Sequence, residues 1–114
     1  MIHITEKIHV SEKIHISELE MIEVLKILTK NFADGYVLAF GSRCKGTHKK
    51  FSDLDLAFVK DDGMSLTISE WGSLKEAFEE SDLVFRVDVV DYWGTTDNFR
   101  AIIDKDCVQI YRSE

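Results

Sequence analysis

Apolar residues along the chain recur first at helical spacing. From residue 18 onward the apolar positions at i, i+4, i+7 and i+11 are Met21, Leu25, Leu28 and Phe32. Ser17, followed three residues later by Glu20, has the spacing of a capping box, which marks the start of a helix. We therefore expect a helix from residue 18 to about Asn31, ended by the Asp34-Gly35 pair.

Shorter apolar runs, with β-branched and aromatic residues, predict four strands. They cover residues 36–40, 54–60, 83–92 and 107–111. Two more helices are expected between them, at about 66–80 and 97–104, although Gly72 weakens the first by about 1 kcal/mol. Because helices alternate with strands, the sequence predicts an α/β (α+β) fold, a sheet of about four strands with helices packed on it.

Composition restricts the class of protein. A chain of 114 residues, 45% hydrophobic and 31% charged, is sufficient for one compact domain. No apolar run reaches the length of a membrane span, and the N-terminus is too polar for a signal peptide. Two cysteines without disulfide-like spacing favour a reducing cytoplasm. The net charge of −7 argues against tight nucleic-acid binding by this subunit alone.

A six-residue repeat distinguishes the N-terminus. Ile-His-Ile-Thr-Glu-Lys at residues 2–7 returns with small changes at residues 8–13 and, incomplete, at residues 14–18. Its histidines would lie about 20 Å apart in a strand and about 9 Å apart in a helix, so one chain cannot gather them around one ion. We expect residues 1–17 to form an extended arm before a domain of residues 18–114. The alternatives are an edge strand that pairs with a partner, or a metal bridge between chains.

The stretch GSRCKGTHKKFSDLDLAF, residues 41–58, holds the candidate chemistry. Gly41-Ser42 follows an apolar strand, where a turn exposes backbone N–H groups and glycine lets a phosphate approach the backbone. The serine hydroxyl is a further donor. Positive side chains lie beside the same turn: Arg43, Lys45, Lys49 and Lys50. This pattern indicates a site for a polyphosphate.

Two aspartates stand at the start of the next strand. Asp53 and Asp55 are separated by one residue, so they share a face, with Cα atoms about 7 Å apart. Two like charges in that position repel unless a cation lies between them. Ligands that are all oxygen suit Mg²⁺ or Mn²⁺. The spacing therefore predicts a site for one or two such ions.

A third carboxylate would complete a site for two metal ions. Asp88 stands between valines in the predicted strand 83–92, where an unpaired carboxylate is costly to bury. Asp91 is the competitor, but its odd spacing from Asp88 turns it to the other face. We therefore favour Asp88 as the third ligand.

Other reactive or aromatic side chains receive structural interpretations. His48 is expected in solvent rather than on a phosphate. Trp71 and Trp93 are expected in packing or interfaces rather than as base-stacking platforms. Cys44 lies in the phosphate turn, where neighbouring positive charges could lower its pKa, but we assign it no catalytic role.

Together these residues resemble the DNA polymerase β-like nucleotidyltransferase superfamily. Its signature is Gly-Ser, ten residues, then Asp-x-Asp, with a later strand aspartate. Gly-Ser-Arg-x-x-Gly resembles the smallest branch, the minimal nucleotidyltransferases (MNT), and the similarity covers about residues 18–112. It implies a mixed sheet with helices on one face. It also implies transfer of a nucleoside monophosphate from a nucleoside triphosphate to a hydroxyl.

The resemblance implies a role for each matching residue. The carboxylates that would bind two Mg²⁺ or Mn²⁺ ions are those of Asp53, Asp55 and Asp88. Gly41 and Ser42 would hold the triphosphate, and Arg43 would support the phosphates or the turn. The family's Arg-Ala-Arg stretch reads Arg43-Cys44-Lys45 here, and Lys45 keeps the charge without the bidentate fork of arginine.

Members of this branch are usually paired with a helical HEPN-domain protein, often as antitoxin and toxin. The resemblance therefore implies AMP transfer from ATP to a hydroxyl of such a partner, in a hetero-oligomer that could contain a homodimer. Tyr92 and Trp93 are expected near the open side of the site, as interface anchors. Two alternatives remain: a nucleotide-binding or toxin-neutralising module without significant catalysis, and a transferase acting on a small-molecule hydroxyl.

Overall fold

The computed structural model describes residues 14–114, so most of the predicted arm, residues 1–13, lies outside the described residues. The elements follow in the order α2 (Glu18–Asn31), β1 (Gly35–Phe40), α3 (Ser42–Lys45), β2 (Leu54–Lys60), α4 (Ile68–Glu79), β3 (Val87–Asp91), α5 (Asp97–Asp106) and β4 (Val108–Arg112). The predicted helices and strands are confirmed, and α3 is an additional short helix. Within residues 14–114 no helix is both long and apolar enough to cross a membrane.

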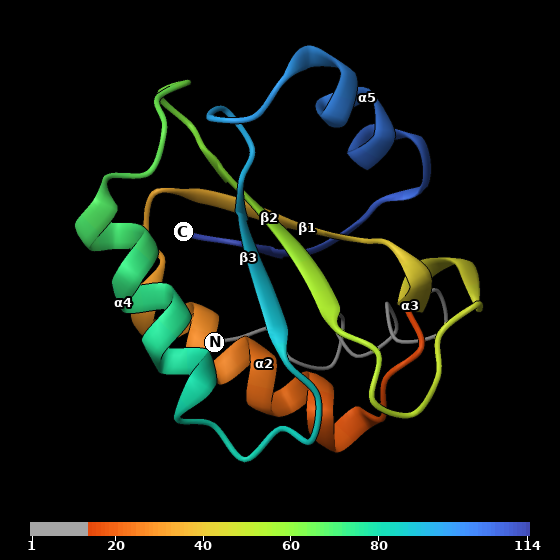
Figure 1. Cartoon of the computed structure of the whole chain (residues 1–114). Coiled ribbons are helices and arrows are strands. Elements are labelled where there is room, and N and C mark those ends of the chain that lie inside the picture. Colours follow the sequence, from red (N-terminus) through yellow and green to blue (C-terminus); the bar gives the residue numbers. More distant parts are fainter. Residues whose placement is uncertain (1–13) are drawn as a thin grey trace.

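The described strands form one mixed sheet in the order β3-β2-β1-β4 (Figure 1). β1 runs antiparallel to β2 and to β4, whereas β2 and β3 are parallel. A parallel pair needs a crossover, and α4 supplies it between the end of β2 and the start of β3. As a result β2 and β3 begin at the same edge of the sheet, next to the end of β1.

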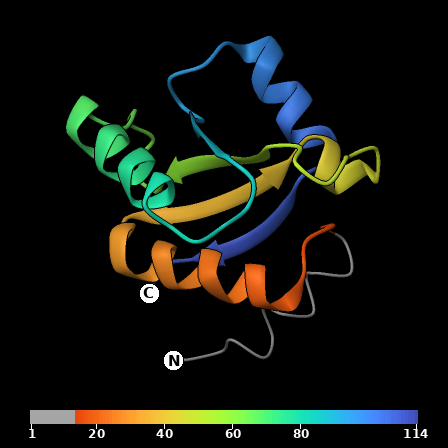
Figure 2. The same ribbon diagram turned by 60° about the horizontal axis from the view of Figure 1, so that its bottom comes forward.

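Helices cover both faces of the sheet. α2 and α4 pack on one face over the main core, whose buried members include Met21, Leu28, Leu56, Leu74 and Phe58. On the other face, Ile103 of α5 packs with Leu38, Phe40, Ala57 and Val59. Figure 2 shows α2 below the sheet and α5 above it. The expectation of helices on one face is therefore wrong for α5, because successive residues of β1 and β2 are apolar and both faces need cover.

Helix starts are set by local capping. Ser17 and Glu20 form the predicted capping box, with the Glu20 N–H donating to Ser17 Oγ at 3.1 Å. A second box, made by Thr67 and Glu70, begins α4 at Ile68 rather than at residue 66. The Thr-x-x-Glu spacing was present in the sequence as a signal for this boundary.

β3 is shorter than the apolar run that predicted it. It covers Val87–Asp91 rather than residues 83–92. Its neighbour β2 begins at Leu54, which pairs with Val87, so the residues before Val87 have no β2 residue beside them in the ladder. Ser81 Oγ donates to the Phe78 carbonyl and accepts from the Leu83 N–H, which holds this segment in a turn after α4.

Candidate active site

Gly41 brings the end of β1 against the start of β2. Its backbone has φ 85° and ψ −158°, a conformation that side-chain-bearing residues rarely adopt. A Cβ atom on residue 41 would stand 2.1 Å from Asp55 Oδ2. The turn therefore requires glycine both for its backbone angles and for the close approach of the carboxylate. Ser42 follows as the first residue of α3, and both residues stand where the sequence predicted the phosphate turn.

Asp55 and Asp88 lie side by side on neighbouring strands. The parallel register pairs them directly, and paired residues of adjacent strands point to the same face. Their sequence neighbours Leu56 and Val89 belong to the core under α2 and α4, so both aspartates face the α5 side of the sheet. Asp55 is half-buried and Asp88 is exposed, so the pair opens to solvent at one side.

The electrostatics of Asp55 show that three carboxylates share this edge. Burial, the largest cause, and the negative charges of Asp88 and Asp53 together raise the pKa of the Asp55 carboxyl to about 6. Each added negative charge makes ionisation of Asp55 harder. A bound cation would reverse this effect, because it favours the ionised carboxylates.

Asp53 has a partner that the sequence analysis missed. Arg86 Nη2 donates to Asp53 Oδ2 at 3.0 Å, and their side chains are 85% and 38% exposed. The available signal was that Arg86-x-Asp88 repeats the spacing of Asp53-x-Asp55. That signal becomes informative only when the two strands are known to be parallel and in register.

Arg43 supports the turn from inside the protein. Its side chain is 4% exposed and lies over the ring of Phe85, 4.3 Å from the centroid. Its Nε, Nη1 and Nη2 atoms donate to three carbonyl oxygens, those of Ser52, His15 and Lys50. Of the two roles expected for Arg43, this geometry supports the structural one. Lys45, by contrast, is exposed at the end of α3, where it adds positive charge beside the turn.

Two neighbours of the turn differ from their sequence interpretation. His48 is half-buried rather than solvated, and its ring stacks on that of His15 with 5.2 Å between centroids. Burial, the largest cause, and nearby negatively charged groups together raise the pKa of the Cys44 thiol to about 11. The expected lowering by Arg43 and Lys45 is therefore wrong, and Cys44 stays a neutral thiol at physiological pH.

The donor set fits Mg²⁺ or Mn²⁺. The side chains of Asp53, Asp55 and Asp88 offer only oxygen ligands, and a divalent cation would relieve the repulsion that, after burial, raises the Asp55 pKa. As they stand, no three His, Cys, Asp or Glu side chains in residues 14–114 are gathered closely enough to hold a metal ion. The ion pair with Arg86 occupies one oxygen of Asp53 in this arrangement.

Asp91 is not part of this group. It pairs with Phe58 in the sheet ladder, at the opposite end of β3 from Val87. A Cβ atom on Gly94 would stand 2.3 Å from Asp91 Oδ2, so this carboxylate lies against the loop that follows β3. The preference for Asp88 over Asp91 agrees with this placement.

The aromatic residues expected beside the site lie at the other end of the sheet. Trp93 Nε1 donates to the carbonyl of Lys60, the last residue of β2, at 2.9 Å. Lys60 is five residues beyond Asp55, or roughly 16 Å along the strand. Tyr92 packs on the α5 side, and its hydroxyl donates to Asp104. The expectation that Tyr92 and Trp93 flank the opening is therefore wrong, because β3 runs away from the carboxylates.

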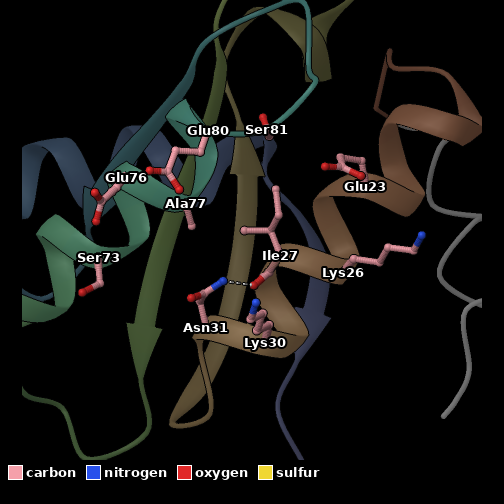
Figure 3. Close-up of a pocket in the computed structure, with 10 residues that line it drawn as sticks. All are labelled: Glu23, Lys26, Ile27, Lys30, Asn31, Ser73, Glu76, Ala77, Glu80 and Ser81. Atoms are coloured by element: carbon pink, nitrogen blue, oxygen red, sulfur yellow. Dashed lines mark hydrogen bonds between the residues drawn. The ribbon is translucent and has the colours of Figure 1, made fainter.

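A groove between α2 and α4 is distinct from this site (Figure 3). It has a volume of about 540 Å³, and the residues that line it are Glu23, Lys26, Ile27, Lys30, Asn31, Ser73, Glu76, Ala77, Glu80 and Ser81. Its lining includes side chains of both signs of charge, and none of the residues expected at the active site lines it. We therefore place the chemistry at the carboxylate edge rather than in the groove.

Comparison with known proteins identifies the family. A family model described as polymerase beta, nucleotidyltransferase matches residues 22–114. The chain belongs to this nucleotidyltransferase family. A relative from Haemophilus influenzae (strain ATCC 51907 / DSM 11121 / KW20 / Rd), named probable protein adenylyltransferase MntA, is 45% identical over 95 residues, which is 83% of this chain and 82% of that protein.

The fold of this nucleotidyltransferase also occurs in a solved structure. A chain from a crystal structure of a toxin-antitoxin with AMP-PNP matches it with a TM-score of 0.68 and 22% identity. The match covers 82% of this chain and 74% of the other. It supports the mixed four-stranded nucleotidyltransferase fold described above. The protein is thus an enzyme of the nucleotidyltransferase class, a minimal member of the polymerase β-like superfamily.

Proposed function

We propose that this nucleotidyltransferase transfers AMP from ATP to a hydroxyl of a helical HEPN-type partner, and that it acts as the antitoxin of that partner. The MntA relative is named a probable protein adenylyltransferase, which supports ATP as donor and a protein as acceptor. The resemblance of Gly41-Ser42 and the aspartates to the minimal branch supports the HEPN partner. The fold neighbour from a toxin-antitoxin structure makes a toxin the first partner to test.

One observation supports this proposal above the others. Gly41, Asp55 and Asp88 meet at one edge of the sheet, where a side chain at position 41 would collide with the Asp55 carboxylate. A phosphate-binding turn and metal-binding carboxylates must touch in an enzyme that acts on a metal-bound triphosphate. Asp61 and Asp62 form another acidic pair, at the end of β2, but there Asp61 accepts hydrogen bonds from Arg112.

Each residue of the site would have a separate role in the reaction. Gly41 leaves room for phosphate oxygens beside the backbone, and exposed Lys45 adds positive charge near them. Asp53, Asp55 and Asp88 would hold Mg²⁺, which when bound neutralises phosphate charge and positions the reacting oxygens. Asp88, exposed at the open side, would accept a hydrogen bond from the incoming hydroxyl and so orient it.

The bond changes then follow from ordinary phosphoryl transfer. The acceptor oxygen bonds to the α-phosphorus while the bond from that phosphorus to the bridging oxygen breaks, and pyrophosphate leaves. The hydroxyl proton passes to the Asp88 carboxylate and from there to solvent. The exposure of Asp88 lets the hydroxyl of a second protein reach this position.

Labelled ATP tests the proposal. The protein and its candidate HEPN partner are incubated with Mg²⁺ and ATP labelled on either the α- or the γ-phosphate. We expect α-label, but not γ-label, on the partner, and a mass increase equal to one adenylyl group, that is, AMP less one water. Asp88→Asn should abolish the labelling, whereas Asp82→Asn, at an exposed acidic residue in the turn after α4, should not.

Other outcomes would favour the remaining functions. Label only on a small molecule would indicate a small-molecule transferase. Tight binding of the partner without any transfer of label would indicate a neutralising module. Transfer of γ-label would contradict nucleotidyl transfer altogether.

A further inference from the structure

Arg86 stands across from Asp53 because of the parallel register. Leu54 pairs with Val87, and the Leu54 N–H donates to the Arg86 carbonyl at 2.8 Å. These contacts fix the backbone of Arg86, while its side chain is 85% exposed. Its guanidinium therefore lies beside the carboxylate edge and remains free to reorient in solvent.

Arg43 and Arg86 differ in the hydrogen bonds that each would lose by turning toward a ligand. The guanidinium of Arg43 is buried and donates to three carbonyls, so turning it toward a phosphate would leave those carbonyls unpaired. Arg86 has a carboxylate partner, Asp53, at 3.0 Å, in a solvent-exposed ion pair. Exchange of such a pair costs little. Arg86 is thus better suited than Arg43 to move onto a ligand.

We propose that Arg86 is a positioning residue that exchanges partners: it holds Asp53 before substrate binds and moves to triphosphate oxygens when Mg²⁺ and ATP enter. The inference rests on the proposed function, since it requires a site for both ligands. A guanidinium has planar N–H donors that fit phosphate as well as carboxylate. The Asp53 oxygen that Arg86 occupies is then released for the cation.

This exchange makes the two ligands depend on each other. Before substrate binds, Arg86 offsets part of the negative charge of the three carboxylates, so Mg²⁺ alone must compete with it. When ATP is present, its phosphates take the guanidinium and remove that competitor. Arg86 should therefore weaken the binding of Mg²⁺ alone and strengthen the binding of ATP together with Mg²⁺.

Calorimetry on the full chain separates these effects. Two affinities are measured: that for Mg²⁺ without nucleotide, and that for ATP at saturating Mg²⁺. For Arg86→Gln we expect tighter binding of Mg²⁺ alone and ATP binding weaker by about 10- to 100-fold, the range for a lost hydrogen bond between charged groups. A loss of folding would weaken both affinities, so opposite signs identify the exchange.

Two further variants sharpen the result. Arg86→Lys keeps the charge but loses the fork, so Mg²⁺ alone should bind as in the wild type while ATP binding stays weakened. Arg112→Gln is the matched control, because Arg112 also pairs with an aspartate, Asp61, and lies at the end of the last strand. It should change neither affinity.

The outcomes distinguish the inference from the function on which it rests. Unchanged affinities in Arg86→Gln, or changes of equal sign, would overturn the partner exchange while wild-type binding leaves the proposed function standing. Full ATP affinity in Arg86→Lys would show that charge alone is sufficient and would overturn the positioning role. A wild-type protein that binds neither ligand would overturn both.

Discussion

The two ends of the parallel strand pair β2–β3 are both acidic, yet their charges are arranged differently. Where the strands begin, the carboxylates of Asp53, Asp55 and Asp88 lie near one another. Arg86 pairs with the first of them. Where β2 ends, Asp61 accepts from both terminal nitrogens of Arg112 at 3.1 Å, and Lys60 pairs with Glu70 at 3.2 Å.

One backbone carbonyl at the second end also accepts a hydrogen bond from a side chain. Trp93 donates to the Lys60 carbonyl at 2.9 Å, whereas Asp91, the last residue of β3, has one buried oxygen, Oδ1, that accepts no hydrogen bond within residues 14–114. At the first end, by contrast, burial and the negative charges of Asp88 and Asp53 together raise the pKa of Asp55 to about 6. Acidic residues that neighbour each other in sequence therefore do not mark a site by themselves. A site is marked where the fold leaves their charge unbalanced.

The largest effect on AMP transfer is expected where the strands begin. Removing one carboxylate charge at each end of the strand pair tests this. Asp88→Asn removes the carboxylate that faces the incoming hydroxyl, and we expect AMP transfer to fall by on the order of 1,000-fold. Asp61→Asn removes a carboxylate that only pairs with Arg112, so transfer should stay within about twofold. The initial rate of label transfer measures both. Equal losses in the two variants would remove the distinction between the ends.

Two glycines offer a second contrast, with effects of opposite sign. Gly41→Ala places a Cβ 2.1 Å from Asp55 Oδ2 at a φ of +85°, so we expect at least about 2 kcal/mol of lost stability and weak ATP binding. Gly72→Ala lies in α4 with no atom within 4 Å of the new Cβ, and should stabilise by about 0.5–1 kcal/mol. Urea denaturation gives both values. A neutral Gly41→Ala would show that the turn tolerates a side chain.

The sequence predicted those parts of the site that depend on local pattern. Gly41 is visible because a strand ends there, and Asp53 with Asp55 because alternate strand residues share a face. α2 was predicted because its capping box and apolar spacing lie within one segment. Asp88 required one further assumption, that its strand lies beside β2, which the register confirms.

What the sequence did not predict depends on contacts between distant segments. The Arg86–Asp53 pair joins residues 33 positions apart and follows from the parallel register. The choice between the two roles expected for Arg43 depends on carbonyls from two separate segments, that of His15 and those of Lys50 and Ser52. Trp93 was misplaced because the direction of β3 relative to the carboxylates is a property of the sheet, not of the strand.

The pH dependence of stability gives a third test of the unbalanced end. The pKa of Asp55 is raised from 3.8 to about 6, so the folded state holds this proton more tightly than the unfolded state. Between those values the folded protein binds more protons, and the Asp55 contribution to the free energy of unfolding falls as pH rises. That contribution is present in full below pH 3.8 and is lost above about pH 6.

Asp55→Asn isolates this contribution from other titrating groups. Without added metal, the melting temperature of the variant relative to the wild type should rise from pH 4 to pH 7, because the variant avoids both the burial of a charge and the repulsion by Asp88 and Asp53. Mg²⁺ at pH 7 should stabilise the wild type more than the variant, since the cation relieves the same repulsion. A difference between the two proteins that is independent of pH would contradict the raised pKa.

The smallest effect is expected at the balanced end. The Arg112–Asp61 pair is bidentate, but its side chains are 47% and 53% exposed, and solvent screens such pairs strongly. Arg112→Gln should therefore shift the melting temperature by no more than a few degrees. Its stacking on Tyr36, 4.8 Å from the ring centroid, is largely kept by the planar amide of glutamine.

A thermal scan of Arg112→Gln, of Asp61→Asn and of the double variant measures how strongly the two charges are coupled. If Arg112 and Asp61 were coupled as strongly as Arg86 is to the bound ligands, this pair would also belong to a functional site. The contrast between the two ends would then fail.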